Sequence, residues 1–173
     1  AADLDGDRRK VGEPQQGVRG DDGAAGRQGD AAAEVAGELG LNCIIHQRNA
    51  LEDTLAQLQP FANRVRGVFH CFADDAAAMN RIVALGSLVS FTGILTFKNG
   101  QNVRETVAAT PLGKFMLETD CPYLAPVPYR GKRCEPAMVA HTAKVLAEVR
   151  GLAPEALAEL TTANFHRLFR KAA

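Results

Sequence analysis

The decisive stretch of this chain is residues 118–126, which read Glu118-Thr119-Asp120-Cys121-Pro122-Tyr123-Leu124-Ala125-Pro126. This stretch closes the apolar run 115–117 and leads into the basic segment 129–133, Tyr-Arg-Gly-Lys-Arg. Two carboxylates one residue apart, Glu118 and Asp120, therefore follow a predicted strand directly. Carboxylates in this position suit a metal ion, and a basic loop beside them suits a phosphate group.

Strand and helix patterns alternate on both sides of this stretch. Strands are predicted at 41–46, 65–72, 88–91 and 115–117, where apolar residues run together. Helices are predicted at 31–39, from Ala50 after an Asn49 cap, after Asp74 or Asp75, around Val103 and Val107, and from 135 to a stop at Gly151. A short helix at 154–160 and a last helix from Thr162 or Asn164, with Phe165, Leu168 and Phe169 inward, complete the chain. This alternation predicts an α/β fold with a parallel sheet built from βαβ units.

Composition divides the chain near residue 30. Residues 1–30 contain seven Gly and six Asp and no aromatic side chain. Such a segment cannot bury enough apolar surface to offset the entropy of ordering it, so we expect loop or disorder there. Residues 31–173 are expected to form one globular domain, which suits a total length of 173 residues.

Charge and cysteine content restrict the class of protein. The formal net charge is zero, so a nucleic acid would have to bind through a local basic patch. The four cysteines are scattered without a Cys-x-x-Cys pair, which favours a reduced, cytoplasmic protein. We expect no membrane association, because there is neither a signal peptide nor an apolar run of about 18 residues.

Two histidines occupy the same kind of position as the carboxylate pair. His46 and His70 each end an apolar run, and the active sites of parallel α/β folds lie at the carboxyl ends of the strands. A single histidine at a strand end is more often a hydrogen-bonded structural residue. Two histidines together with Asp120 favour a site for a divalent metal ion.

Basic and aromatic residues close to these positions leave two interpretations open. Arg48 lies two residues after His46, and Arg130, Lys132 and Arg133 lie in the loop after Asp120. These cations either contact substrate phosphate or form a solvated surface. Tyr123 either stacks on a nucleic-acid base or packs against Pro122.

The combination of segments resembles the TatD family of metal-dependent deoxyribonucleases, within the amidohydrolase-like TIM barrels. The matching segments are IIHQR (44–48), GVFHCF (67–72), SFTGILTFKN (90–99), LETDCPYLAPVPYRGKR (117–133), EP (135–136) and LTTANFHRLF (160–169). With the helices between them they cover about residues 31–171. The segment 117–133 is the most specific of these.

The resemblance implies roles for individual residues. His46, His70 and Asp120 match metal ligands, and Asp120 also orients the attacking water. Glu118 matches its acidic catalytic partner, and Arg48 matches the residue beside the substrate phosphate. The implied cofactor is a divalent metal, Mg²⁺, Mn²⁺ or Zn²⁺. The implied activity is hydrolysis of phosphodiester bonds in DNA as a 3′–5′ exonuclease.

The chain departs from the family pattern in its first part. Family members begin with a strand bearing His-x-His, and no such pair occurs in this sequence. A bridging Glu in a GExGLD-like motif has one candidate here, Glu13, although Pro14-Gln15-Gln16 follows it. Residues 1–30 otherwise resemble no part of the family.

We therefore expect a partial TIM barrel, the carboxyl-terminal half to two-thirds of an eight-strand fold of about 250 residues. Open barrel edges would favour self-association. Two alternatives to a DNase remain. The chain could be a truncated, inactive remnant that acts at most as a metal-binding or interaction module, or an ester or amide hydrolase on a related barrel.

Overall fold

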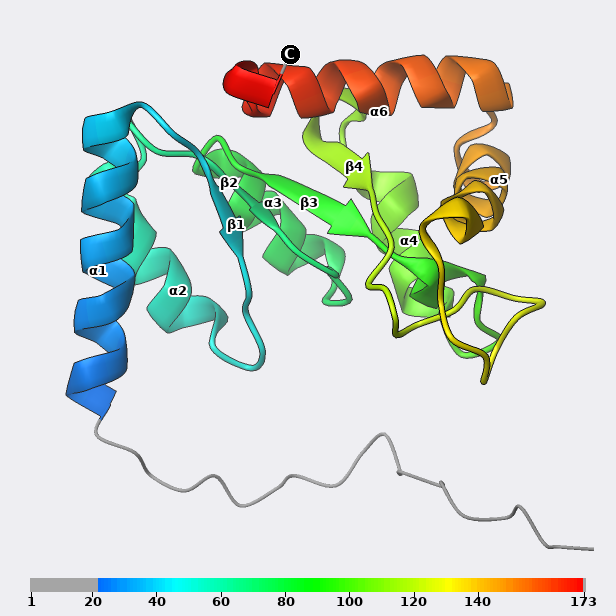
Figure 1. The fold of residues 1–173 in the computed structure, drawn as a ribbon, viewed down its shortest axis with the longest axis horizontal. Coiled ribbons are helices and arrows are strands. Elements are labelled where there is room, and N and C mark those ends of the chain that lie inside the picture. The colour runs from blue at the N-terminus through cyan, green and yellow to red at the C-terminus, as the bar shows by residue number, and fades with distance from the viewer. Residues whose placement is uncertain (1–21, 173) are drawn as a thin grey trace, which may run out of the picture.

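The molecule, a computed structural model, is described for the backbone of residues 22–172 and for the side chains of residues 31–172. One four-stranded parallel sheet lies at its centre, in the order β1-β2-β3-β4 (Figure 1). The strands are β1 (Cys43–Ile45), β2 (Gly67–Phe69), β3 (Leu88–Phe91) and β4 (Phe115–Leu117). The helices between them are α2 (Leu51–Leu58), α3 (Ala76–Ala84) and α4 (Gln101–Ala109), and α5 (Val139–Arg150) and α6 (Pro154–Leu168) follow the sheet. The predicted α/β fold with a parallel sheet is confirmed.

The two faces of the sheet are buried to different extents. Neighbouring residues of a strand point to opposite faces, so Phe69 and Val68 of β2 belong to different apolar clusters. The larger cluster lies on the face that the helices cover, and its fully buried members include Met79, Ile82, Val89, Phe91, Val103, Val107, Phe115 and Leu146. The smaller cluster contains only Val68, Leu88, Met116 and Leu168 as buried residues. Most of the apolar stabilisation therefore comes from the helical side.

Local signals set most helix ends. The Asp75 carboxylate caps α3 by accepting a hydrogen bond from the Ala78 amide at 2.9 Å, and Gly151 ends α5 with a φ of 64°. The prediction that Asn49 caps the next helix is wrong. It has a φ of 54°, and α2 begins two residues later without a side-chain cap. The left-handed conformation that Asn tolerates is used here to turn the chain out of β1.

The prediction of two helices after Pro154 is wrong, because α6 is continuous through Thr161. The Thr161 hydroxyl, which lies between the two predicted helices, donates to the Leu157 carbonyl oxygen at 3.0 Å within the helix. Phe165 was expected to point inward, but it is 40% exposed. The buried positions are Leu157, Thr161, Asn164 and Leu168, which share one helical face.

The prediction of loop or disorder is wrong for residues 22–30, because they form the first half of α1 (Asp22–Leu39). These nine residues hold three glycines and only two alanines, so the favourable helix propensity comes from the second half of α1, where Ala31–Ala33 and Ala36 lie. Ala33 and Ala36 of α1 are buried, and the helix packs beside α2. Residues 1–21 and Glu13 among them lie outside the described part of the chain.

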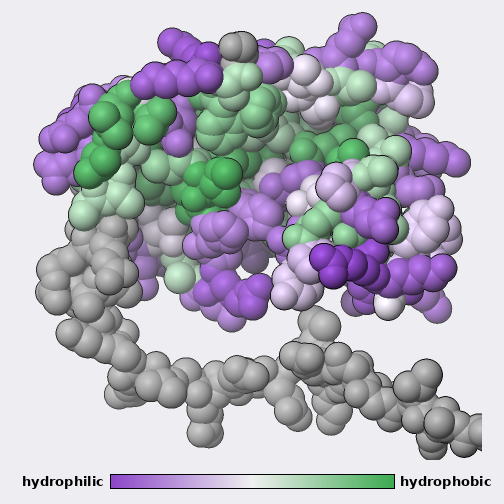
Figure 2. Space-filling view, viewed as in Figure 1, coloured by the Kyte–Doolittle hydropathy of each residue, from purple (hydrophilic) through white to green (hydrophobic). Residues whose placement is uncertain are grey.

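Both edge strands of the sheet have one partner each within the described residues. Strand β1 pairs only with β2 and β4 only with β3, and Ile44 in the centre of β1 is 60% exposed. Val35, Leu39 and Leu41 are also exposed, and Figure 2 shows apolar surface over the sheet between α1 and α6. Exposed apolar surface beside an unpaired strand is a site for association with further polypeptide.

None of the described helices has both the length and the apolar character needed to cross a membrane.

Asn164 offers a direct test of how α6 is held on the sheet. Its side-chain amide donates to the carbonyl oxygens of Leu112 and Phe115 at 2.8 and 2.9 Å. Asn164→Ala leaves both acceptors without this donor, so we expect the free energy of unfolding to fall by about 2 kcal/mol or more. Urea denaturation measures the change. Thr162→Ala on the exposed side of α6 is the control, expected within about 0.5 kcal/mol of the parent protein; equal effects would contradict the assigned role.

Candidate active site

Four polar side chains predicted from the sequence lie at the carboxyl ends of the strands. His46 follows β1, His70 follows β2, and Glu118 and Asp120 follow β4. The backbone keeps these ends in register, because the His70 amide donates to the Ile45 carbonyl oxygen at 2.9 Å. Strands β1 and β2 are shorter than predicted, so His46 and His70 lie in loops at the mouth of the sheet, as Glu118 and Asp120 do.

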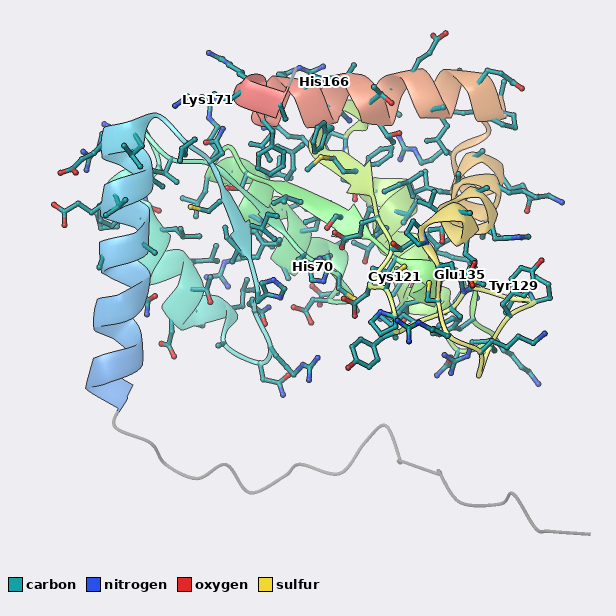
Figure 3. The ribbon with its side chains drawn as sticks, in the orientation of Figure 1. His70, Cys121, Tyr129, Glu135, His166 and Lys171 are labelled. Carbon is teal, nitrogen blue, oxygen red and sulfur yellow. The ribbon has the colours of Figure 1, made fainter. Side chains whose placement is uncertain are left out.

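His70 joins the two carboxylates of the 118–126 stretch. Its Nδ1 lies 2.8 Å from Glu118 Oε2, and its Nε2 lies 3.1 Å from Asp120 Oδ1. Figure 3 labels His70 at this end of the sheet. Since each ring nitrogen faces a carboxylate, the orientation of the imidazole is fixed from both sides.

Glu118 is held in place by two further donors. The Cys71 amide and the Ser90 hydroxyl each donate to Glu118 Oε1 at 2.6 Å. Cys71 has a φ of 52°, an uncommon conformation outside glycine, and its amide makes this hydrogen bond there. The Glu118 carboxylate therefore links three neighbouring strands, β2, β3 and β4.

Sequence reasoning did not single out Ser90 or Gly93. Ser90 is almost fully buried within the apolar strand β3, and a hydroxyl in such a position was an available signal. Gly93 lies against the 118–126 stretch, where an added Cβ would collide with the carbonyl oxygen of Leu124. The need for a glycine at this position follows from a tertiary contact and could not be read from the sequence.

A cavity of about 800 Å³ opens above these residues. His46 and His70 both line it, and their ring centroids are 4.6 Å apart. The lining includes His46, Arg48, His70, Asp120 and Tyr123, all of which were predicted as site residues. Glu118 does not line the cavity, since it lies behind His70.

The three cations of the loop after Asp120 do not line this cavity. The Arg130 guanidinium lies 3.8 Å from the centre of the Phe97 ring, and the Lys132 ammonium lies 5.9 Å from the Tyr129 ring. Arg133 is exposed. Of the predicted phosphate contacts, the structure places only Arg48 beside His46 and His70.

Comparison with known proteins decides the family. A model of the family described as TatD related DNase matches residues 30–170. The chain belongs to this family. The resemblance predicted from the sequence is thereby confirmed.

Relatives of the TatD-family chain agree with this assignment. The uncharacterized metal-dependent hydrolase YcfH of Escherichia coli K12 is 44% identical over 137 residues, covering 79% of this chain and 52% of YcfH. The 3′-5′ ssDNA/RNA exonuclease TatD of Erwinia billingiae is 35% identical over 147 residues, covering 82% of this chain and 56% of that protein. The chain spans about half the length of the curated relatives it matches.

Solved structures show the same fold. The crystal structure of YjjV, a TatD homologue from Escherichia coli K12, matches with a TM-score of 0.78 and 27% identity, over 92% of this chain and 63% of YjjV. A TatD family hydrolase from Entamoeba histolytica matches with a TM-score of 0.70 and 18% identity, over 80% of this chain and 54% of that one, and shows the fold alone. The predicted TIM-barrel-like hydrolase fold is confirmed, and this chain contains part of it.

The donors present suit a divalent metal in kind but not in number. Imidazole nitrogen and carboxylate oxygen are ordinary ligands of divalent ions. Over the residues whose side chains are described, however, no group of three or more His, Cys, Asp or Glu side chains is arranged to hold a metal ion. His46, His70 and Asp120 are therefore donors of the right kind, but the described side chains do not assemble a complete metal site.

The surroundings of His70 favour its protonated form. Burial by itself lowers the pKa of His70, but the hydrogen bonds and negative charges of Glu118 and Asp120 outweigh burial, and the pKa is raised. Only the imidazolium can donate from both nitrogens, so only that form satisfies both carboxylates at once.

This raised pKa predicts how the stability of the metal-free protein depends on pH. A histidine in the unfolded chain has a pKa of about 6.5. Because the pKa is higher in the folded state, the full stabilising contribution of His70 is present below this pH. The contribution is lost as the pH rises through the folded pKa. Urea denaturation in EDTA should therefore show a gap between the parent and His70→Gln that shrinks with rising pH. A gap that is constant or grows with pH would contradict the arrangement.

Proposed function

We propose that this chain supplies the carboxyl-terminal part of a metal-dependent phosphodiester hydrolase that acts on DNA from its 3′ end. One observation carries the proposal, which is the placement of His46, Arg48, His70 and Asp120 around one cavity at the carboxyl ends of parallel strands. The family match and the exonuclease named among its relatives support this class of substrate.

The residues divide the chemistry between them. The Asp120 carboxylate faces the cavity and is placed to orient a water molecule and accept its proton. Glu118 acts through His70, so we assign it as a positioning residue instead of a direct catalytic partner. A bound divalent ion would supply charge stabilisation of the phosphoryl group and a more acidic water.

Substrate contacts follow from the same cavity. Arg48 is the cation of its lining, and a guanidinium suits phosphate oxygens. Tyr123 is 68% exposed at the rim and can stack on a base of a single strand. Arg130, Lys132 and Arg133 lie outside the cavity and would add only general attraction for a longer strand.

The test of the proposed function is release of nucleotides from single-stranded DNA with Mg²⁺ or Mn²⁺. We expect Asp120→Asn to lower the rate by about a hundredfold or more, since it removes the proton acceptor and keeps the shape. Glu135→Gln, an exposed carboxylate outside the cavity, is the matched control and should leave the rate unchanged. Equal rates for the parent and Asp120→Asn would contradict the assignment.

A second candidate function is supported by the incomplete donor set. If the chain has no partner that contributes ligands, the site lacks the coordination that fixes a catalytic metal. The chain would then be an inactive remnant that binds metal weakly or serves as an interaction module. A folded sample with no nuclease activity above that of Asp120→Asn would favour this function.

Arg48 tests the class of substrate separately from catalysis. In EDTA, Arg48→Ala should weaken binding of a single-stranded oligonucleotide and lower the salt slope of binding by about one. Fluorescence anisotropy at several salt concentrations gives both values. Arg133→Ala removes the same charge outside the cavity and should have the smaller effect. An unchanged affinity in Arg48→Ala would favour an ester or amide substrate.

The open β1 edge predicts self-association of this chain. The exposed Ile44 and its apolar neighbours are expected to meet a second copy or the remaining strands of the fold. Light scattering should show a mean mass that rises with protein concentration, and Ile44→Lys should reduce the rise. A monomer at all concentrations would contradict this expectation.

A further inference from the structure

A second cavity lies at the opposite end of the sheet from the candidate active site. Its volume is about 650 Å³, and it is walled by the loops that precede the strands and by the end of α6. Figure 3 labels Lys171 and His166 beside α6, at the end of the molecule away from His70. No residue lines both cavities.

Six cationic side chains line this second cavity. They are Arg64, Arg66, Lys114, Arg167, Arg170 and Lys171. Over residues 31–172, where side chains are described, no carboxylate lines the cavity and none forms a salt bridge with any of the six. The protein as a whole has zero net charge, so this concentration of one sign is local.

Helix α6 accounts for only some of these charges. Cations near the carboxyl end of a helix are common, because they offset its partial negative charge. Arg167, Arg170 and Lys171 can be explained in this way. Arg66 comes from the loop before β2, where no such helix end explains it. Lys114 ends the 3-10 turn Leu112–Lys114 before β4, and its ammonium donates to the Gly86 carbonyl oxygen at 3.3 Å.

The cations lie close enough to repel one another. Burial and the charges of Arg66 and Arg167 lower the pKa of Lys114. The Arg167 guanidinium lies against Gly113, and the Arg66 side chain lies against Gly86, so glycines leave room for both on the loops of the cavity wall. An anion placed among them would relieve this repulsion.

The remaining lining fits a ligand that is more than a single ion. Leu41, Leu88, Leu168 and Phe169 give the cavity an apolar wall. Asn164, another lining residue, is fully buried, and its Oδ1 has no hydrogen-bond partner among the described residues. The volume falls within the range of small-molecule sites, roughly 300–1,000 Å³.

We infer that this cavity binds a small anion with two or more phosphate groups, either inorganic or carried by a nucleoside. Arginine forks and a lysine without carboxylate partners are the donors such a ligand requires. The site is separate from the candidate active site and needs no divalent metal.

Isothermal titration calorimetry in EDTA tests the inference, with inorganic tripolyphosphate and a nucleoside triphosphate as probes. The parent protein should bind, and the double variant Arg66→Gln/Arg167→Gln should bind about tenfold more weakly or worse. Lys144→Gln, an exposed lysine of α5, and Asp120→Asn should bind like the parent. Tighter binding of the nucleoside triphosphate than of tripolyphosphate would indicate that the base contacts the apolar wall. Equal binding would indicate that the cavity recognises the phosphate chain alone.

Thermal unfolding keeps the test independent of folding defects. Without ligand, the double variant should be at least as stable as the parent, because it removes like-charge repulsion. With tripolyphosphate, only the parent and the control variants should gain stability. Absence of binding by the parent, or equal loss in Lys144→Gln, would overturn the inference. A response to single-stranded DNA without any response to tripolyphosphate would also overturn it, in favour of a nucleic-acid surface.

Discussion

The hydrogen bonds of the Glu118 carboxylate are the interaction on which the rest of the site depends. One oxygen faces His70, and the other accepts from the Cys71 amide and the Ser90 hydroxyl. A partly buried carboxylate is stable only when such donors satisfy it. Because the donors come from β2 and β3 and the carboxylate follows β4, this one group holds three strand ends in a common geometry. His70 then presents its second nitrogen to Asp120, at the cavity.

The parallel register turns separate sequence signals into one site. The carboxyl ends of the strands lie far apart in the chain but side by side in the sheet. His46, His70 and Asp120 therefore come together although 74 residues separate the first from the last. The loops that precede the strands lie together at the amino ends of the strands, and several cations lie in them. The two ends of one sheet thus present different chemistry. Carboxylate and imidazole groups lie at one end, and cations without a carboxylate partner among the described side chains lie at the other.

Much of the fold could be predicted from the sequence because its signals are local. The cap of α3 is Asp75, one of its two predicted candidates, and the strands 88–91 and 115–117 and the Gly151 stop depend on nearby residues and were predicted as found. Features that depend on distant contacts were not. The polar residues Thr162 and Asn164 suggested the start of a new helix, but Asn164 instead bonds to the loop before β4 from within a continuous α6. A glycine is needed at position 93 because the Leu124 carbonyl packs against it. The loop cations share the sequence neighbourhood of Asp120, yet Arg130 stacks on Phe97 away from the cavity.

We propose that His46, His70 and Asp120 belong to a divalent metal site that needs further donors to complete it. Titration of the chain with Mn²⁺, followed by electron paramagnetic resonance, measures this binding directly. We expect weak binding that Asp120→Asn abolishes, because no three donors are assembled among the described side chains. Tight binding of two ions per monomeric chain would contradict it.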